Sequence, residues 1–258
     1  CGFDFRGTLM RIQRETDGAT ILPFHDLPLS EADKAILGGL VFVRKTCPPH
    51  TDLATDGDDR DRTFLVGKGW TVLYRILANG ERHILDFPVS GDLISLSGSR
   101  HGVQLSFMAI TEATVYEINT PSLIAAAANL KGLVELLFAE TARHSAILVE
   151  HMVNLGRRSA LSRVAHLLLE MGVRLNMAGL GQPDDYECPL TQYDLADALG
   201  LTAIHVNRML RELRRSDLLH FHKNSVGLLD RKMLATLAGF DPTYLRRDSA
   251  QNNQLGRR

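Results

Sequence analysis

Residues 191–219 read TQYDLADALGLTAIHVNRMLRELRRSDLL, and they decide how the C-terminal half of the chain folds. Thr191 with Asp194 three positions later is a capping box, the sequence signature of a helix start. Ala196 is followed four residues later by Gly200, with an apolar residue six positions further on. A small residue lets two helices cross closely, and glycine permits the tight turn between them. This spacing predicts a helix-turn-helix.

The second helix of this pair has one apolar and one basic face, and Thr202 is a suitable N-cap for it. The apolar positions recur at helical spacing and are expected in the core: Val206, Met209, Leu210 and Leu213. The other positions are expected to face solvent: His205, Asn207, Arg208, Arg211, Glu212, Arg214 and Arg215. Residues 203–215 therefore carry a local charge of +3, although the net charge of the chain is −1. Salt screens charges beyond about 10 Å, so the charges close to a phosphate, and not the net charge of the chain, decide phosphate binding. The helix is therefore predicted to bind DNA rather than to be only a solvated surface helix.

The residues around this pair complete a small C-terminal domain. A helical pattern covers 161–179, and a polar loop is expected over 181–188. After the basic helix, two short apolar runs flank 223–225, which predicts a β-hairpin, the wing of a winged helix.

The N-terminal half of the chain has a different residue pattern, with short β-branched or aromatic runs between turn signals. Strands are expected at 39–46, 62–69, 70–77, 83–89, 102–110 and 113–118. Asn79 and Gly80 form a strong hairpin signal, because both residue types accept positive φ. Trp70 and Tyr74 are expected in the barrel core. The predicted fold class is α+β, with an N-terminal antiparallel β-barrel or jelly roll, a long helix and a C-terminal winged helix-turn-helix. The polar first twenty residues are expected to fray.

A helical stretch over 122–155 follows, with a break expected near Gly132. It carries a heptad seam of apolar and small residues that can form a dimer interface. The seam residues are Val134, Phe138, Thr141, Ser145, Leu148, Met152 and Leu155. The alternative is a helix that packs on its own barrel. A domain hinge is expected at 156–160.

Composition narrows the class of protein. Residues 157–258 hold 15 Lys+Arg and 11 Asp+Glu, a balance of +4, whereas residues 1–156 carry −5. No apolar run approaches the roughly 18 residues of a membrane span, and no signal pattern opens the chain, so we expect a cytoplasmic protein without a membrane partner. Cys1, Cys47 and Cys188 lack C-x-x-C spacing, which argues against a disulfide framework or a metal cluster.

The stretch 191–219, together with KGWTVLYRILANGERHILDFPVSGDLI at 68–94, resembles the Crp/Fnr family of bacterial transcription regulators. The resemblance extends over roughly residues 25 to 240. It implies a homodimer with a cyclic-nucleotide-binding-like effector domain at 21–129, a dimerisation helix at 130–156 and a winged helix-turn-helix at 157–242. The implied partners are a palindromic DNA operator, with half-sites roughly 34 Å apart, and RNA polymerase if the protein is an activator.

The resemblance also implies which residues touch DNA. These are Thr202, Ala203, Ile204, His205, Asn207, Arg208, Arg211 and Arg215. Family members commonly carry a glutamate, which accepts from a cytosine amine, four residues before an arginine that binds guanine. Arg208 keeps the arginine, but Ile204 stands at the glutamate position and could touch a thymine methyl. We therefore expect a variant of the family's half-site.

The effector pocket departs from the family pattern as well. It is expected at Gly91, Asp92, Leu96, Arg100, Val103 and Gln104. Cyclic-nucleotide binders place an Arg-Ser pair where this chain has Val103 and Gln104, and a glutamate where it has Leu96. Phosphate binding needs a cation or several donors. We expect no cyclic AMP, and no iron–sulfur cluster or haem.

No enzyme is expected. The chain has no G-x-S-x-G, Walker loop, dinucleotide glycine pattern or H-E-x-x-H. No metal site is expected from the histidine pairs at 220/222 and 144/151. Two alternatives stay open: an effector- or partner-binding barrel with a vestigial DNA-binding domain, and a DNA-binding protein that takes no ligand.

Overall fold

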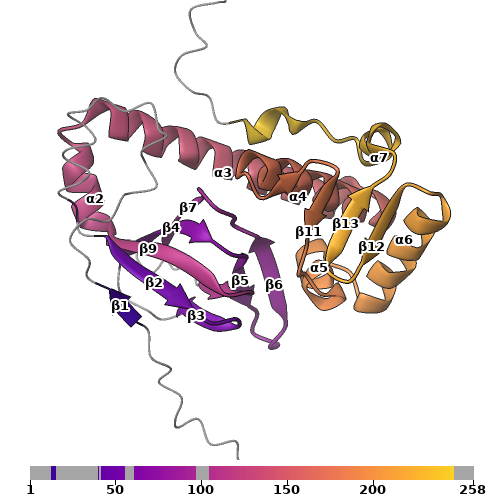
Figure 1. Cartoon of the computed structure of the whole chain (residues 1–258), viewed down its shortest axis with the longest axis horizontal. Coiled ribbons are helices and arrows are strands. Elements are labelled where there is room, and N and C mark those ends of the chain that lie inside the picture. Colours follow the sequence, from indigo (N-terminus) through magenta and orange to yellow (C-terminus); the bar gives the residue numbers. More distant parts are fainter. Residues whose placement is uncertain (1–12, 16–39, 41, 56–60, 97–104, 247–258) are drawn as a thin grey trace, which may run out of the picture.

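In the computed structural model of the chain, residues 13–15, 40, 42–55, 61–96 and 105–246 are described. The N-terminal part is a β-roll, a long helix runs along it, and the C-terminal part lies at the far end of that helix (Figure 1). This arrangement confirms the predicted α+β class.

The roll consists of two antiparallel sheets. The five-stranded sheet contains, in order, β1 (Gln13–Glu15), β2 (Val43–Cys47), β9 (Ala113–Asn119), β4 (Arg62–Lys68) and β7 (Leu93–Leu96). The four-stranded sheet contains β3 (Thr51–Ala54), β8 (Ser106–Ala109), β5 (Thr71–Ile76) and β6 (Arg82–Asp86). No strand pairing joins the two sheets among the described residues, so the roll is not a closed barrel.

Apolar side chains from both sheets fill the roll, with Phe64, Val66, Phe107 and Val115 fully buried. This packing accounts for the β-branched and aromatic runs that predicted the strands. Three short strands of the roll were not predicted. These are β1, in the stretch expected to fray, where it pairs with β2, then β3, which pairs with β8, and β7, which pairs with β4.

The predicted hairpin joins β5 and β6. Gly80 has φ +84, but Asn79 does not adopt positive φ, contrary to the expectation for both residues. Instead the Asn79 side chain accepts a hydrogen bond from the Glu81 amide at 3.0 Å, an Asx-type turn.

The helical stretch is divided into α2 (Thr120–Ala127) and α3 (Lys131–Arg157). The break at 128–130 lies just before Gly132, as predicted. One face of α3 is buried, through Leu133, Ile147 and Asn154, and the other is exposed. Within the described part of the chain, no helix has the length and apolarity to cross a membrane.

The C-terminal part starts with α4 (Ala160–Met177), capped by Ser159. The elements that follow are β10 (Gly181–Gln182), β11 (Asp185–Glu187), α5 (Gln192–Leu199), α6 (Ala203–Arg215), β12 (Leu219–His222), β13 (Ser225–Leu228), α7 (Arg231–Ala238) and the 3-10 helix η2 (Pro242–Leu245). The wing hairpin is confirmed. The loop expected over 181–188 is wrong, because β10 and β11 extend the wing into a four-stranded sheet.

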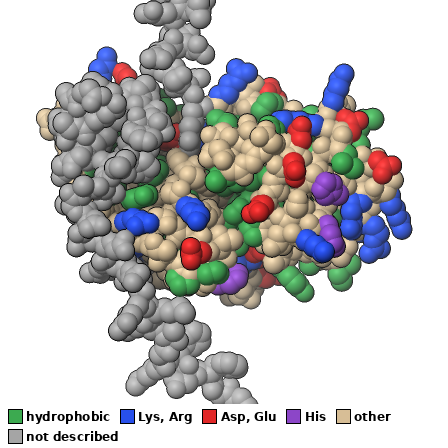
Figure 2. Space-filling view, viewed as in Figure 1, with side chains coloured by type: hydrophobic (Ala, Val, Ile, Leu, Met, Phe, Trp, Pro, Cys, Tyr) green, Lys and Arg blue, Asp and Glu red, His purple; other side chains and the backbone are tan. Residues whose placement is uncertain are grey.

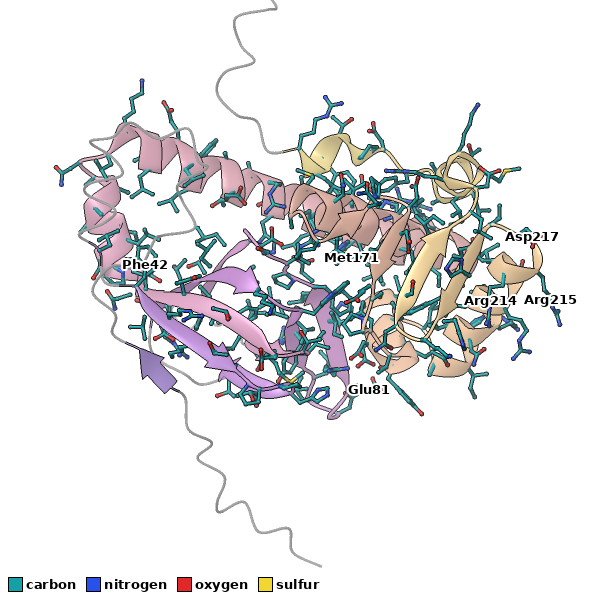
Figure 3. The ribbon with its side chains drawn as sticks, viewed as in Figure 1. Phe42, Glu81, Met171, Arg214, Arg215 and Asp217 are labelled. Atoms are coloured by element: carbon teal, nitrogen blue, oxygen red, sulfur yellow. The ribbon has the colours of Figure 1, made fainter. Side chains whose placement is uncertain are left out.

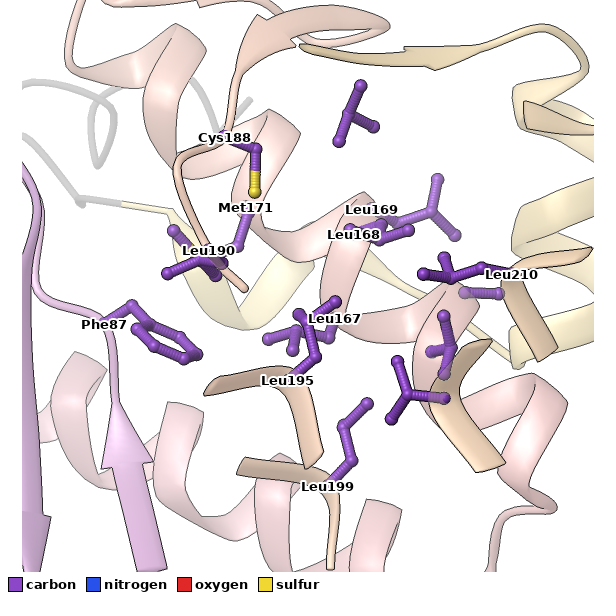
Figure 4. Close-up of a cluster of buried hydrophobic side chains, with 14 of the residues drawn as sticks. Phe87, Leu167, Leu168, Leu169, Met171, Cys188, Leu190, Leu195, Leu199 and Leu210 are labelled. Atoms are coloured by element: carbon purple, nitrogen blue, oxygen red, sulfur yellow. The ribbon is translucent and has the colours of Figure 1, made fainter. Parts of the chain in front are cut away.

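One apolar cluster joins the roll to the C-terminal part. Phe87 from the end of β6 packs with Leu167, Leu195 and Leu199 of α4 and α5 (Figure 4). Trp70 belongs to this shared cluster and not to the inner core of the roll, where the sequence placed it. The two parts of the chain are therefore packed together through a common core.

Candidate DNA interface

The capping residues predicted from the sequence build the helix-turn-helix. The Thr191 hydroxyl accepts from the Asp194 amide at 3.1 Å, and the Asp194 carboxylate accepts from the Thr191 amide at 2.9 Å. Gly200 ends α5 in the left-handed region, with φ 61 and ψ 42. The Thr202 hydroxyl accepts from the His205 amide at 3.2 Å and starts α6. Each of these contacts satisfies a helix-end group that would otherwise lack a partner.

The inner face of α6 is buried as predicted. Val206, Met209, Leu210 and Leu213 pack into the cluster that also holds α4 and α5. Burying side chains of this size stabilises by about 1.5–3 kcal/mol each, so the orientation of α6 on the domain is well fixed.

The outer face of α6 carries the predicted contact residues. Ile204 is 85% exposed at the start of the helix, and Arg208, Arg211 and Arg215 are exposed along it. Basic side chains gather at this end of the molecule (Figure 2), where Arg214 and Arg215 project into solvent (Figure 3). The structure thus brings the predicted set together on one accessible surface.

Two polar contacts order this surface. The Arg208 guanidinium donates to Nε2 of His205, which makes Nε2 an acceptor. The Asn207 amide donates to the Gln192 side chain of α5 at 3.1 Å. Arg208 and Asn207 are thus held in place before any ligand arrives, which lowers the ordering cost of a contact.

Sequence reasoning missed three residues beside this surface. Gln192 and Tyr193 lie at the start of α5, and Tyr193 is 72% exposed. Lys223 is exposed at the tip of the wing, where it and Asn224 adopt positive φ. The helix start after Thr191 and the predicted hairpin turn were signals that could have identified them.

The seam predicted for dimerisation lies on the exposed face of α3. Phe138 is 76% and Met152 71% exposed, while Leu148 and Leu155 are half-buried. The hydroxyls of Thr141 and Ser145 donate to carbonyls of the same helix, so they need no polar partner across the seam. Phe138 and Met152 therefore do not pack on the roll, whereas Leu133, on the buried face of α3, clusters with Leu65 and Ile118 of the roll.

The predicted effector-pocket residues are only partly visible. Arg100, Val103 and Gln104 lie outside the described residues. Gly91 has φ +88, and Leu96 is buried in the roll core. The Asp92 carboxylate faces the helices, where Arg143 and Arg174 donate to it.

A buried charge cluster lies where the roll, α3 and α4 meet. Arg174 of α4, 3% exposed, donates to Asp86 at 2.6 and 3.1 Å, to Asp92 at 2.8 Å and to Glu170 at 3.2 Å. His151 of α3 contacts Glu170 at 3.0 Å and the carbonyl of Leu85 at 2.9 Å. Three parts of the fold therefore share one set of buried charges.

The ionisation states in this cluster follow from its contacts. Burial alone would lower the pKa of His151, but the charge and hydrogen bond of Glu170 outweigh it and raise that pKa to about 9. Burial alone would raise the pKa of Glu170, but His151 and Arg174 lower it to about 2. The pKa of Asp86 is likewise lowered by Arg174 against the effect of burial. Asp86, His151, Glu170 and Arg174 are thus charged at neutral pH.

Donor atoms of Asp86, His151 and Glu170 lie within 4.8 Å of one another, as in a metal site. Arg174 already binds both carboxylates, however, and a metal ion would lie against its guanidinium. Like charges at this distance repel strongly in a buried site. The chain supplies its own cation here, and the geometry gives no support to a metal.

The link between roll and helix-turn-helix continues at the surface. Arg82, in β6, donates at 2.7 Å to both Asp194 and Asp197 of α5. The ring of His83 bonds to the Asp197 carbonyl at 3.0 Å. The β5–β6 hairpin therefore touches the first helix of the DNA-binding pair directly.

Comparisons with known proteins agree with this architecture. Residues 162–237 match the Crp-like helix-turn-helix domain. The chain is 32% identical over 186 residues to the nitrogen fixation regulation protein FixK of Bradyrhizobium diazoefficiens, covering 68% of this chain and 73% of FixK. It is 29% identical over 192 residues to the transcriptional activatory protein AadR of Rhodopseudomonas palustris, covering 74% of this chain and 79% of AadR. The structure of FixK2 from Bradyrhizobium japonicum superposes with a TM-score of 0.69 at 28% identity, over 78% of this chain and 100% of FixK2.

Proposed function

Because the chain belongs to the Crp/Fnr family of transcription regulators, we propose that it is a homodimer that binds a palindromic DNA operator through α6 of each chain. The outer face of α6 carries the proposal. It is exposed, basic and ordered by its own hydrogen bonds, although the net charge of the chain is −1. The division into an effector domain at 21–129, a dimerisation helix at 130–156 and a DNA-binding domain at 157–242 belongs to the same proposal.

The residues on α6 divide into two roles. Arg208 donates to a guanine edge, Asn207 reads a neighbouring base, and Ile204 contacts a thymine methyl. The remaining contacts position the helix on the phosphate backbone. These are Thr202, Ala203, His205, Arg211 and Arg215. An isoleucine cannot accept a hydrogen bond, so the half-site differs from the family's usual one at that base.

The exposed seam of α3 supports the homodimer. Within one chain, the large apolar side chains of Phe138 and Met152 are mostly exposed to water. Pairing two copies of α3 would bury both. A two-fold dimer would set the two copies of α6 roughly 34 Å apart, one turn of DNA.

The effector is proposed to be something other than cyclic AMP. The residues at the phosphate-binding positions of this family, Val103 and Gln104, carry no cation. An iron–sulfur cluster is disfavoured because Cys1, Cys47 and Cys188 lie far apart in the sequence and lack the clustered spacing of cluster-binding cysteines. Adding cyclic AMP should leave the melting temperature of the chain unchanged, and a clear rise would contradict this part of the proposal.

The test is selection of bound duplexes from a random DNA pool, followed by titration of the enriched sequence at several salt concentrations. We expect an enriched palindrome whose affinity falls steeply with salt, since each neutralised phosphate releases counterions. No enrichment and no DNA affinity would refute the proposal and favour a partner-binding roll with a vestigial DNA-binding domain. If the protein activates transcription from such a site, we expect it also to contact RNA polymerase at the promoter.

A further inference from the structure

The Asp92 side chain joins three parts of the molecule through one carboxylate. Oδ1 accepts from Arg143 of α3 at 2.6 Å, and Oδ2 accepts from Arg174 of α4 at 2.8 Å. All three side chains are almost completely buried. A charge-assisted pair of this length in a buried site holds its partners firmly, because leaving either charge unpaired there is costly.

The turn that carries Asp92 fixes where the carboxylate points. The Val89 amide donates to Oδ2 at 2.9 Å, and the Asp92 amide donates back to the Val89 carbonyl at 2.9 Å. The preceding Gly91 has φ +88 and bonds through its amide to the Val66 carbonyl. The turn leads directly into β7, whose last residue, Leu96, is like Gly91 and Asp92 one of the expected effector-pocket residues. A shift of this turn therefore moves the carboxylate.

The arginine on the other side is attached to the DNA-binding domain. Arg174 lies on α4, and α4 packs against α6 and α7. The carboxylates of Asp86 and Glu170 bind the same guanidinium, so Arg174 is restrained from the roll and from its own helix at once. Phe87, which directly follows Asp86 in the sequence, belongs to the apolar cluster that contains side chains of α4 (Figure 4).

We propose that Asp92 is a positioning residue that couples the turn before β7 and the dimerisation helix to the pose of the DNA-binding helices. This inference rests on the proposed function. In the pose described, the outer face of α6 is open to solvent, so the coupling does not block DNA. The coupling through Asp92 fixes the orientation of the DNA-binding domain before DNA binds. Without it the domain would move more freely, and the loss of that freedom on binding would cost free energy. Removing the Asp92 charge should therefore weaken operator binding.

The test compares Asp92→Asn with a matched control, Glu117→Gln. Asparagine keeps the shape of the side chain and an oxygen for the Val89 amide but loses the charge. Glu117 is a half-buried carboxylate, 16% exposed, that also has two cationic partners, Lys45 at 2.5 Å and Arg62 at 3.2 Å, but all three lie within the roll. Both variants lose a charge that is paired with two cations, and only Asp92→Asn removes a contact with α4.

Two measurements are made on the full chain. The first is the spin-label distance between the roll and α6, with labels at Lys68→Cys and Glu212→Cys in a Cys1→Ser background. Labelled chains are diluted with unlabelled ones so that distances within one chain dominate. The second is affinity for the selected operator. We expect Asp92→Asn to widen the distance distribution at least twofold and to raise the operator Kd at least fivefold, and Glu117→Gln to change neither.

Arg174→Met, combined with Asp92→Asn, completes the test as a double-mutant cycle. The effects of the two changes on the operator Kd should be strongly non-additive, since each change removes the same contact between Asp92 and Arg174. The inference is overturned if Asp92→Asn gives the same distances and the same operator Kd as the unmodified chain. It is also overturned if Asp92→Asn tightens operator binding, or if its effects equal those of Glu117→Gln. If the unmodified chain binds no operator, the proposed function fails, and the distance measurement still decides whether Asp92 sets the domain pose.

Discussion

The substitution His151→Gln is expected to change how the stability of the protein depends on pH. His151 contacts Glu170 at 3.0 Å and the Leu85 carbonyl at 2.9 Å, an arrangement in which both ring nitrogens face acceptors. Its pKa is therefore raised from 6.5 to about 9 in the folded chain, because the Glu170 contact outweighs the opposing effect of burial. Glutamine keeps one hydrogen bond but carries no charge.

The direction and size of the effect follow from these two pKa values. A raised pKa means that the folded chain binds the proton more tightly than the unfolded chain does. The resulting stability is complete below about pH 6.5 and is lost as the pH rises through about 9. At about 1.4 kcal/mol per pH unit, the contribution to the free energy of unfolding is at most about 3 kcal/mol.

The measurement is urea unfolding of both proteins, followed by circular dichroism from about pH 6 to 10 at one chain concentration, because a dimer's stability depends on concentration. The unfolded-state ionisation of Cys47 and Cys188 also lowers stability at high pH, but it is common to both proteins and cancels in their difference. We expect that difference to shrink by about 3 kcal/mol across the range. Parallel curves would refute the reasoning, and so would a His151 ring signal in nuclear magnetic resonance that titrates near pH 6.5.

Three further changes test other parts of the structure. Arg208→Ala should weaken operator binding by about 1–3 kcal/mol and relax the preference at one base, measured by titration against single-base variants of the selected site; unchanged affinity and preference would exclude Arg208 as a base contact. Phe138→Glu should weaken the dimer by about 3 kcal/mol or more in sedimentation experiments, because it puts a charge in the apolar seam, and a dimer of unchanged strength would exclude that seam. Tyr244→Phe should lower the free energy of unfolding by about 1–3 kcal/mol, since the hydroxyl donates at 2.8 Å to the buried Glu170 carboxylate; equal unfolding curves would mean that this bond adds nothing.

Local signals in the sequence predicted most of the helices and most of the strands of the roll. Thr191, Asp194 and Thr202 cap their helices as expected, and the period of the apolar residues on α6 identified its buried face. These features depend on neighbours a few residues away, which is why one sequence was enough to find them. The short strand β11 was missed because one of its pairing partners, β13, lies some forty residues further along the chain, and β10 is only two residues long and pairs with β11.

The buried charge cluster could not be derived in the same way. Arg174 binds Asp86 and Asp92, which are 88 and 82 positions away, and no local pattern joins them. One signal was present: His166, Glu170 and Arg174 follow one another at spacings of four within 164–175, a stretch that is otherwise apolar. Such a stripe of polar residues would ordinarily face solvent, and here all three side chains are buried.

The apolar cluster around Phe87 limits how freely the C-terminal part can be exchanged. Helix-turn-helix units are often treated as interchangeable cassettes, but α4 and α5 share their core with β6 and with Trp70. A chimaera that joined this C-terminal part to another regulator's roll would expose Leu167 and its neighbours unless the facing residues were transplanted too. Altering the DNA specificity of such a regulator is therefore better done by substitutions on the outer face of α6 than by exchange of whole domains.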